Sequence, residues 1–207
     1  PRSTLFPYTT LFRSIVLGYA YPDVRLPYVS EDLAAAAVHA ALRLIALGHR
    51  RIVLLRPERE LAGHRVIHDA LAGCLRARLG IPARRVGAVH DGTVAGACRT
   101  LDLLLDRPEP PTAVLTVTSG ALVTVATHLG RRGVRIGRDL SLVHMFEDPV
   151  LQTIVPSVAH YRVNPQVLVG RLAERVVRLA ASGRATLRPA RVMCTFVPGE
   201  SLAPSRA

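Results

Sequence analysis

The chain has 207 residues, of which 49% are hydrophobic, and it carries a formal net charge of +12 at pH 7. This length and hydrophobicity exclude a disordered protein and predict one large domain or two small ones. Because no apolar run approaches the roughly 20 residues that a membrane helix needs, we expect no membrane segment.

The basic charge comes entirely from arginine, since the 27 Lys+Arg residues include no lysine. The arginines stand singly or in pairs, which favours a solvated surface over a nucleic-acid-binding tract. Without lysine, a Walker A nucleotide site and Schiff-base chemistry are excluded. Cys74, Cys98 and Cys194 stand in apolar contexts, which favours buried thiols in a reducing compartment, the cytoplasm.

The first 14 residues are interpreted as a non-native segment. Thr4–Ser14, TLFPYTTLFRS, resembles the translation of a common sequencing-library adapter. We therefore exclude residues 1–14 from the fold prediction and expect the native part to begin near Ile15, truncated at its N-terminus. The alternative is a genuine aromatic-rich strand.

A helix flanked by strands is predicted next. Ile15–Tyr19 is predicted to be a buried strand. Asp32 is a good N-cap residue, and the apolar residues after it recur at the spacing of an alanine-rich helix face. Gly48 stands where a helix end requires a positive φ. Ile52–Leu55 is an unbroken apolar run, typical of a parallel strand covered on both faces, so Val29–Leu55 predicts half of an α/β layer.

The same alternation continues to Met145. The predicted helices cover about residues 63–79, 93–105 and 119–132, and the predicted strands cover 86–89, 113–117 and 140–145. Gly80 and Gly133 are expected to end the first and the last of these helices, and Ser119 to cap the start of the last. Strict alternation predicts a parallel sheet with right-handed crossovers.

The pattern changes after Pro149. Leu151–Val155 is a strand-like run, and Asn164–Pro165 predicts the start of a long helix that ends at Gly183. A last strand is predicted at Val192–Val197.

Several motifs carry a family resemblance, and they occur in order: Val29–Asp32 (VSED), Leu47–Ile52 (LGHRRI), Pro111–Val114 (PTAV), Gly133–Ser141 (GVRIGRDLS) and Pro149–Ile154 (PVLQTI). With this spacing the chain resembles the effector-binding domain of the LacI/GalR (lactose-repressor) family of bacterial transcription regulators. The resemblance covers about residues 15–204. The set of motifs is fairly specific, whereas each motif alone is weak.

The resemblance implies an α/β fold of the periplasmic-binding-protein-like type I, with two Rossmann-like lobes that have parallel sheets and hold a small ligand in the cleft between them. The three crossovers between lobes would fall near Glu31, Glu147 and Leu187. The C-terminal lobe would cover about residues 32–146 plus 187–204, and an incomplete N-terminal lobe 15–30 plus 148–184. Apolar surface would be exposed where the rest of that lobe packs.

The resemblance also implies ligand contacts. Arg65 matches a family arginine that binds sugar hydroxyls or an acidic group, the alternative being an ordinary exposed helix arginine. Thr118 and Ser119 occupy a position where the family commonly has Asn-Asp; their hydroxyls bind a ligand or, as we prefer, cap the helix. Phe146 occupies the position of a ligand-binding Asp, so the carboxylate is lost or shifted to Glu147. Phe146 would then stack on a ring or only fill space.

Other candidate sites are weaker. Tyr19 lines the opposite wall of the cleft or packs in the core. His64 and His68 are spaced as a metal pair, but further ligands are missing, so we expect no metal and no cofactor. The sequence has no nucleophile-elbow motif and no dinucleotide fingerprint, and we expect that the protein is not an enzyme.

The expected function is therefore that of a sensor. The resemblance implies a cytoplasmic regulator, a repressor by expectation, that binds a small sugar or related metabolite. It would be a homodimer in the intact protein and would reach operator DNA through an N-terminal helix-turn-helix that this fragment lacks. The alternative is an extracytoplasmic sugar-binding protein of an ABC-type transporter, which would carry a secretory signal and no DNA-reading domain.

Overall fold

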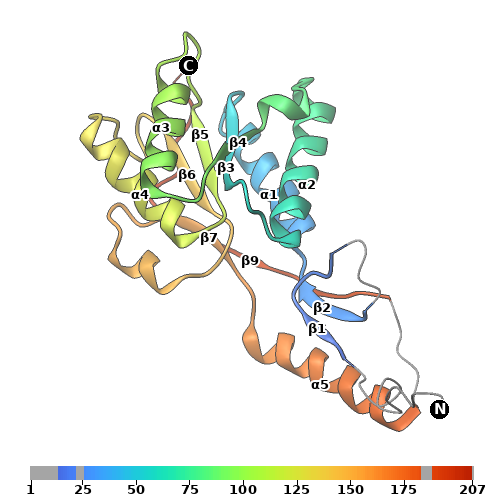
Figure 1. The fold of residues 1–207 in the computed structure, drawn as a ribbon. Coiled ribbons are helices and arrows are strands. Elements are labelled where there is room, and N and C mark those ends of the chain that lie inside the picture. The colour runs from blue at the N-terminus through green and yellow to red at the C-terminus, as the bar shows by residue number, and fades with distance from the viewer. Residues whose placement is uncertain (1–13, 22–25, 183–187, 207) are drawn as a thin grey trace, which may run out of the picture. The chain divides into compact units, whose positions relative to one another are not determined.

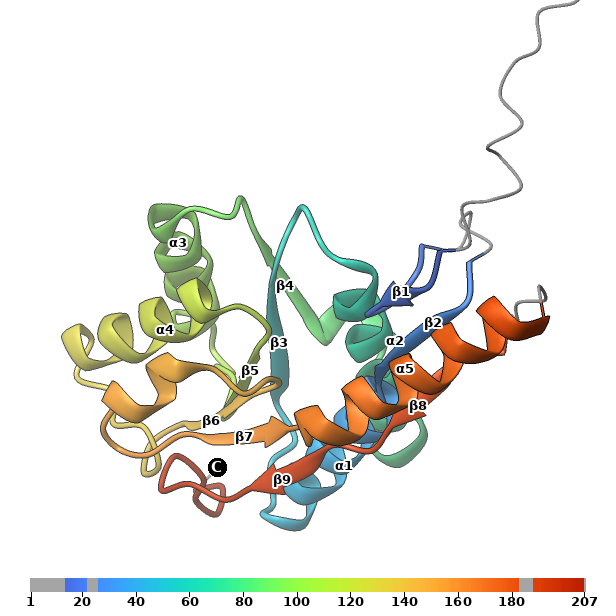
Figure 2. The same cartoon turned by 90° about the horizontal axis from the view of Figure 1, so that it is seen from below.

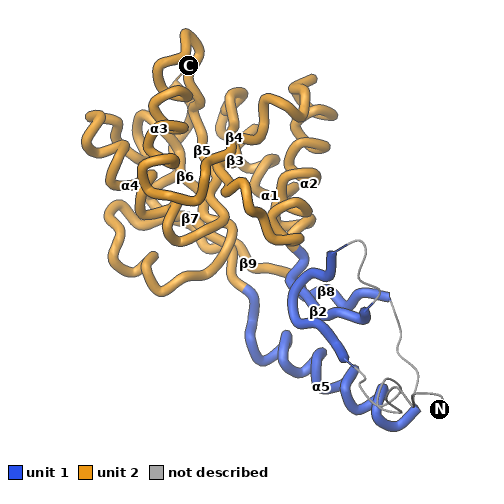
Figure 3. The backbone as a smooth tube through the Cα atoms, viewed as in Figure 1, with its two compact units in different colours: residues 1–32, 163–192 blue, residues 33–162, 193–207 orange. Residues whose placement is uncertain are grey.

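The computed structural model describes residues 14–21, 26–182 and 188–206, and the chain divides into two compact units (Figure 3). Unit 1 comprises residues 1–32 and 163–192, and unit 2 comprises residues 33–162 and 193–207. Each unit has its own sheet flanked by helix, with mostly parallel strands, which confirms the predicted α/β class.

The sheet of unit 2 has the strand order β4–β3–β5–β6–β7–β9 (Figure 1). Its strands are β3 (Ile52–Pro57), β4 (Gly87–His90), β5 (Ala113–Thr116), β6 (Ser141–His144), β7 (Ala159–Arg162) and β9 (Thr195–Val197). Neighbours from β4 to β7 are parallel, and β9 runs antiparallel to β7. Ala113 pairs with both Ile52 and Ser141, so the predicted strands lie side by side in one direction, as expected.

Helices cover both faces of this sheet. Figure 2 shows α1 (Leu33–Ala46) and α2 (Ala62–Leu79) on one face and α3 (Val94–Leu105) and α4 (Ser119–Arg131) on the other. Because both faces are covered, every residue of the central strands β5 and β6 is buried, and Leu115 and Leu142 are fully inaccessible.

Helix α1 forms as its sequence predicts. It begins directly after Asp32 and buries Ala37 and Ala41 completely, since a face of small side chains lies close to the sheet. Gly48 has a φ of 87°, which a residue with a β-carbon adopts only at a cost.

Unit 1 contains a smaller parallel sheet with the order β1–β2–β8, formed by β1 (Val16–Leu17), β2 (Tyr28–Glu31) and β8 (Ala190–Val192). Helix α5 (Pro165–Ser182) packs on β2 and β8. The Asn164 side chain accepts a hydrogen bond from the Gln166 N–H at 2.9 Å, which confirms the predicted N-cap. The α5 valines expose apolar surface, as expected; Val176 is 50% exposed.

Several local predictions are wrong. Of the buried strand predicted at Ile15–Tyr19, only the two residues of β1 form a strand. Leu17 is 53% exposed because β1 lies at the sheet edge. The strand-like run Leu151–Val155 lies mostly in a short 3-10 helix, Pro149–Thr153. This helix forms because Asp148 caps it, accepting from the Val150 N–H at 2.9 Å, and because Pro149 fixes φ.

The C-terminal strands also differ from the prediction. Strand β7 was not predicted, and the run Val192–Val197 is divided between β8 in unit 1 and β9 in unit 2. The chain accordingly passes from one unit to the other after Arg162 and again after Val192. These crossovers were expected near Glu147 and Leu187. The physical reason is that β7 pairs with β6 and with β9, so the segment after Glu147 stays in unit 2. The first crossover between the units, after Asp32, lies next to the one expected near Glu31.

Some predictions fall outside the described residues. These are the interpretation of residues 1–13 as adapter-derived, the helix end at Gly183 and the crossover residue Leu187 itself. Within the described ranges, no helix has the length and apolar character needed to span a membrane. The three cysteines all lie in these ranges, are half-buried rather than buried, and form no disulfide.

Candidate functional site

The carboxyl ends of β3, β5 and β6 lie side by side because these strands are parallel neighbours. Open α/β sheets bind ligands at this edge. The loops and helix starts that follow these strands carry Glu60, Arg65, Thr118, Ser119, Phe146 and Glu147. The sequence-predicted residues of unit 2 therefore follow neighbouring strand ends.

A buried polar pair lies at the end of β5 and β6. Thr116 Oγ1 and His144 Nδ1 are 2.8 Å apart, and both residues are almost fully inaccessible. Burial lowers the pKa of His144 to about 4, since the charged imidazolium would lose its hydration. His144 is therefore neutral at pH 7. Sequence reasoning missed this pair, because Thr116 stands within an apolar run.

Phe146 lies between two imidazole rings. Its ring centroid is 6.2 Å from that of His144 and 6.3 Å from that of His64 on α2. His64 is buried, and burial lowers its pKa as well. Phe146 itself is half-buried, so part of this residue is exposed to solvent.

Arg65 belongs to a charged cluster that the sequence did not reveal. Glu60 accepts from Arg65 Nε at 3.1 Å and from Arg56 Nη1 at 2.6 Å. The Arg65 side chain is 64% exposed, whereas Glu60 is only 15% exposed. The carboxylate of Glu60 thus holds Arg65 at the edge of the sheet, and most of the guanidinium stays accessible.

Orphaned polar atoms lie near this cluster. In the part of the chain that the structure describes, Arg56 Nε and His90 Nε2 are buried without a hydrogen-bond partner. Arg56 and His90 stand at the ends of the paired strands β3 and β4. Buried unpaired donors or acceptors are costly, so these atoms favour a water or a polar ligand group at this edge.

The predicted hydroxyls have structural partners. Thr118, not Ser119, is the N-cap of α4, and its Oγ1 accepts from the Ala121 N–H at 3.3 Å. Ser119 instead donates to the Asp148 carboxylate, and this hydrogen bond is the main cause that lowers the Asp148 pKa. Because Thr118 has the extended backbone of an N-cap residue, the cap falls one residue earlier than predicted.

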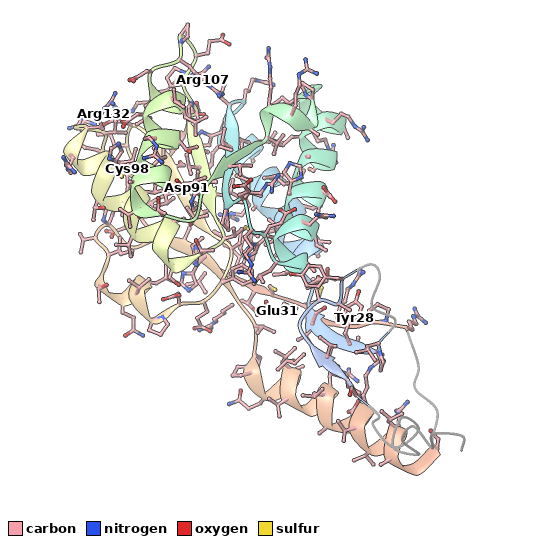
Figure 4. All side chains as sticks on the ribbon, in the orientation of Figure 1. Tyr28, Glu31, Asp91, Cys98, Arg107 and Arg132 are labelled. Atoms are coloured by element: carbon pink, nitrogen blue, oxygen red, sulfur yellow. The ribbon has the colours of Figure 1, made fainter. Side chains whose placement is uncertain are left out.

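The remaining candidates are separate from this group. Glu147 is exposed, and among the described residues it makes no ion pair. Tyr19 is in unit 1, where its hydroxyl donates to the Glu31 carbonyl at 2.8 Å; Tyr28 and Glu31 are labelled in Figure 4.

His64 and His68 each have a polar contact with another group. His64 Nδ1 accepts from the Leu61 N–H at 3.3 Å, and His68 Nδ1 lies 3.0 Å from the Asp69 carboxylate. Across the described ranges, no group of three or more His, Cys, Asp or Glu side chains could hold a metal ion.

Comparison with known proteins agrees with the fold of the chain. Residues 41–202 match the family described as periplasmic binding protein-like domain. The HTH-type transcriptional repressor CytR of Escherichia coli (strain K12) is 31% identical over 143 residues, a match that covers 64% of this chain and 41% of CytR. The chain thus spans less than half of the length of that relative.

Solved structures show the same fold. A LacI family transcriptional regulator from Enterococcus faecium, with bound ribose, has a TM-score of 0.76 at 19% identity, covering 92% of this chain and 70% of that chain. A dimeric Lac repressor with an 11-residue C-terminal deletion has a TM-score of 0.78 at 16% identity, covering 93% and 69%. The chain belongs to the family of periplasmic binding protein-like domains, and it is similar in sequence to CytR and in fold to LacI family regulators.

Proposed function

We propose that this chain is the effector-sensing part of a transcriptional regulator and binds a small sugar-like metabolite at the carboxyl edge of the unit 2 sheet. The relative CytR is a transcriptional repressor, which favours a regulator over a transport protein. A repressor role, a homodimer, and contact with operator DNA through a helix-turn-helix of the intact protein belong to the same proposal.

The observation that carries the proposal is the half-buried Phe146 beside polar groups on neighbouring strands. A sugar ring has an apolar C–H face and a rim of hydroxyls. The half-buried Phe146 suits the face, while the accessible guanidinium of Arg65 offers fixed donors to hydroxyls. The neutral His144, whose ring centroid is 6.2 Å from that of Phe146, places no charge next to the phenyl ring.

Regulation requires more than binding. A ligand shifts a conformational equilibrium only if it binds one state more tightly than the other, and the shift is limited by that difference in affinity. The intact regulator should therefore bind operator DNA with a different affinity when the sugar is present, and by linkage the DNA should change the affinity for the sugar equally.

The test is calorimetric titration of the chain with ribose and a panel of other pentoses, hexoses and disaccharides. At least one sugar should bind with a dissociation constant below about 1 mM, and Phe146→Ala should weaken it roughly tenfold, or about 1.4 kcal/mol. Phe146→Tyr, which keeps the ring, is the matched control. If no sugar binds, or Phe146→Ala binds as tightly as the parent chain, the proposal is wrong.

A further inference from the structure

A pocket lies at the edge of the unit 2 sheet opposite the carboxyl edge, where the parallel strands begin. It has a volume of about 470 Å³, within the range of small-molecule sites. Its walls come from the segment before and at the start of β3, from the connection between α2 and β4, and from the connection between α3 and β5. None of the candidate residues at the carboxyl edge contributes to it.

The lining of this pocket combines an apolar floor with a basic rim. The apolar part is formed by Ile52, Val53, Ile81, Pro108 and Pro111. The charged part is formed by Arg50, Arg51, Arg85, Arg107 and Glu109; Figure 4 labels Arg107, on the loop after α3. Four positive charges thus face one negative charge.

The arginines of the rim are not neutralised by neighbours. Among the described residues, none of the four forms an ion pair, whereas Arg56 and Arg65 at the carboxyl edge share Glu60. The C-termini of α1, α2 and α3 face this edge, but each helix end carries only about half a charge and acts within its last turn. The rim therefore keeps a positive field.

Two hydrogen bonds to backbone carbonyls connect walls of the pocket. Arg51 Nε donates to the Pro110 carbonyl at 2.7 Å, and the Thr112 N–H donates to the Arg51 carbonyl at 2.8 Å. These bonds join two of the three walls, so less ordering is needed when a ligand binds. Arg50, Arg85 and Arg107 remain exposed and free to turn toward an anion.

We propose that this pocket binds a small organic anion, a phosphate monoester or carboxylate with an apolar ring or chain, as a site separate from the sugar-like effector. Guanidinium groups bind such oxyanions through paired N–H donors, while the floor accepts the apolar body. A concave site of this size favours a small molecule over the backbone of a nucleic acid. The inference does not depend on the proposed function.

The test uses phenyl phosphate as the probe, with inorganic phosphate and phenol as its two halves. Phenyl phosphate should bind the full chain with a millimolar or lower dissociation constant and more tightly than either half. Arg85→Gln and Arg107→Gln should each weaken it roughly tenfold, because each removes a charge-assisted hydrogen bond. Arg76→Gln, an exposed arginine on α2, should leave it unchanged.

Two further variants identify the site. Ile81→Trp fills the floor and should abolish binding without loss of the folded circular-dichroism signal. Phe146→Ala should bind phenyl phosphate like the parent chain, which separates this pocket from the carboxyl-edge site. Equal affinity in Arg85→Gln, Arg107→Gln and the parent chain, loss of binding in Phe146→Ala, or binding of phenyl phosphate no tighter than inorganic phosphate would overturn the proposal.

Discussion

Thr116 Oγ1 lies 2.8 Å from Nδ1 of His144, and this contact joins the last residues of two neighbouring strands close to Phe146. The pair is almost fully buried, so each polar atom satisfies the other where water does not reach. It thereby fixes the orientation of the imidazole next to the ring that we propose as the ligand contact.

The first prediction concerns acid stability. Since His144 has a pKa of about 4 when folded and an ordinary value near 6.5 when unfolded, the unfolded chain takes up a proton first as the pH falls. The contribution of neutral His144 to the free energy of unfolding is fully present above about pH 6.5. It is lost as the pH falls toward 4, by about 3 kcal/mol in total. Urea unfolding of the parent chain and His144→Asn between about pH 7.5 and 4.5 measures it.

The difference between the two chains isolates this histidine, because other groups titrate in both. Asp148 and His160 act on it electrostatically and remain in the variant. Identical slopes for His144→Asn and the parent chain would contradict the assignment.

The second prediction separates binding from stability at Arg65. Arg65→Gln should weaken the binding of the sugar found by titration roughly tenfold, because a charge-assisted donor is removed. It should change the free energy of unfolding by less than about 1 kcal/mol, since the Arg65–Glu60 pair is largely exposed on the arginine side. Arg76→Gln is the matched control on the same helix. A variant that binds normally would show that Arg65 is an ordinary surface residue.

The third prediction compares two glycines with positive φ. Gly137 has a φ of 75° and Gly133 a φ of 70°, so alanine costs about 1 kcal/mol of backbone strain at either. At Gly137 the added Cβ would also meet the Glu200 carbonyl oxygen far inside contact distance, whereas at Gly133 nothing lies within 4 Å. Thermal unfolding should therefore show a larger loss for Gly137→Ala than for Gly133→Ala. Equal losses would mean that the C-terminal tail does not pack on Gly137.

The fourth prediction tests how the C-terminal tail is held. The fully buried Ser201 hydroxyl donates to the Leu142 carbonyl at 2.6 Å and accepts from the Ala159 N–H at 2.9 Å. Ser201→Ala removes both of these buried hydrogen bonds and should lower the free energy of unfolding by about 1–3 kcal/mol in urea. Ser205→Ala is the control, because Ser205 binds Leu47 through its backbone N–H. A neutral Ser201→Ala would show that water replaces the hydroxyl.

Local patterns in the sequence were sufficient for the elements that depend on neighbouring residues. The alanine face of α1, the positive φ at Gly48, the buried run at Ile52–Leu55 and the cap at Asn164 are all found in the structure. Each depends on periodicity, on a cap or on backbone sterics within a few residues, which is why one sequence reveals it. The order of strand ends also indicated the edge where the candidate ligand residues lie.

The pairing of distant segments was decided only by the tertiary structure. Strand β9 has three residues, too few for a period, and it belongs to unit 2 because β7 pairs with it. The contacts of Phe146 with His64, of Glu60 with Arg56 and Arg65, and the grouping of arginines at the opposite sheet edge likewise depend on which strands are neighbours. The sequence alone determined the α/β alternation, the positive φ at Gly48 and the cap at Asn164, because these arise from local geometry. The strand order, the unit boundaries and both candidate sites depend on long-range packing, which no local pattern encodes.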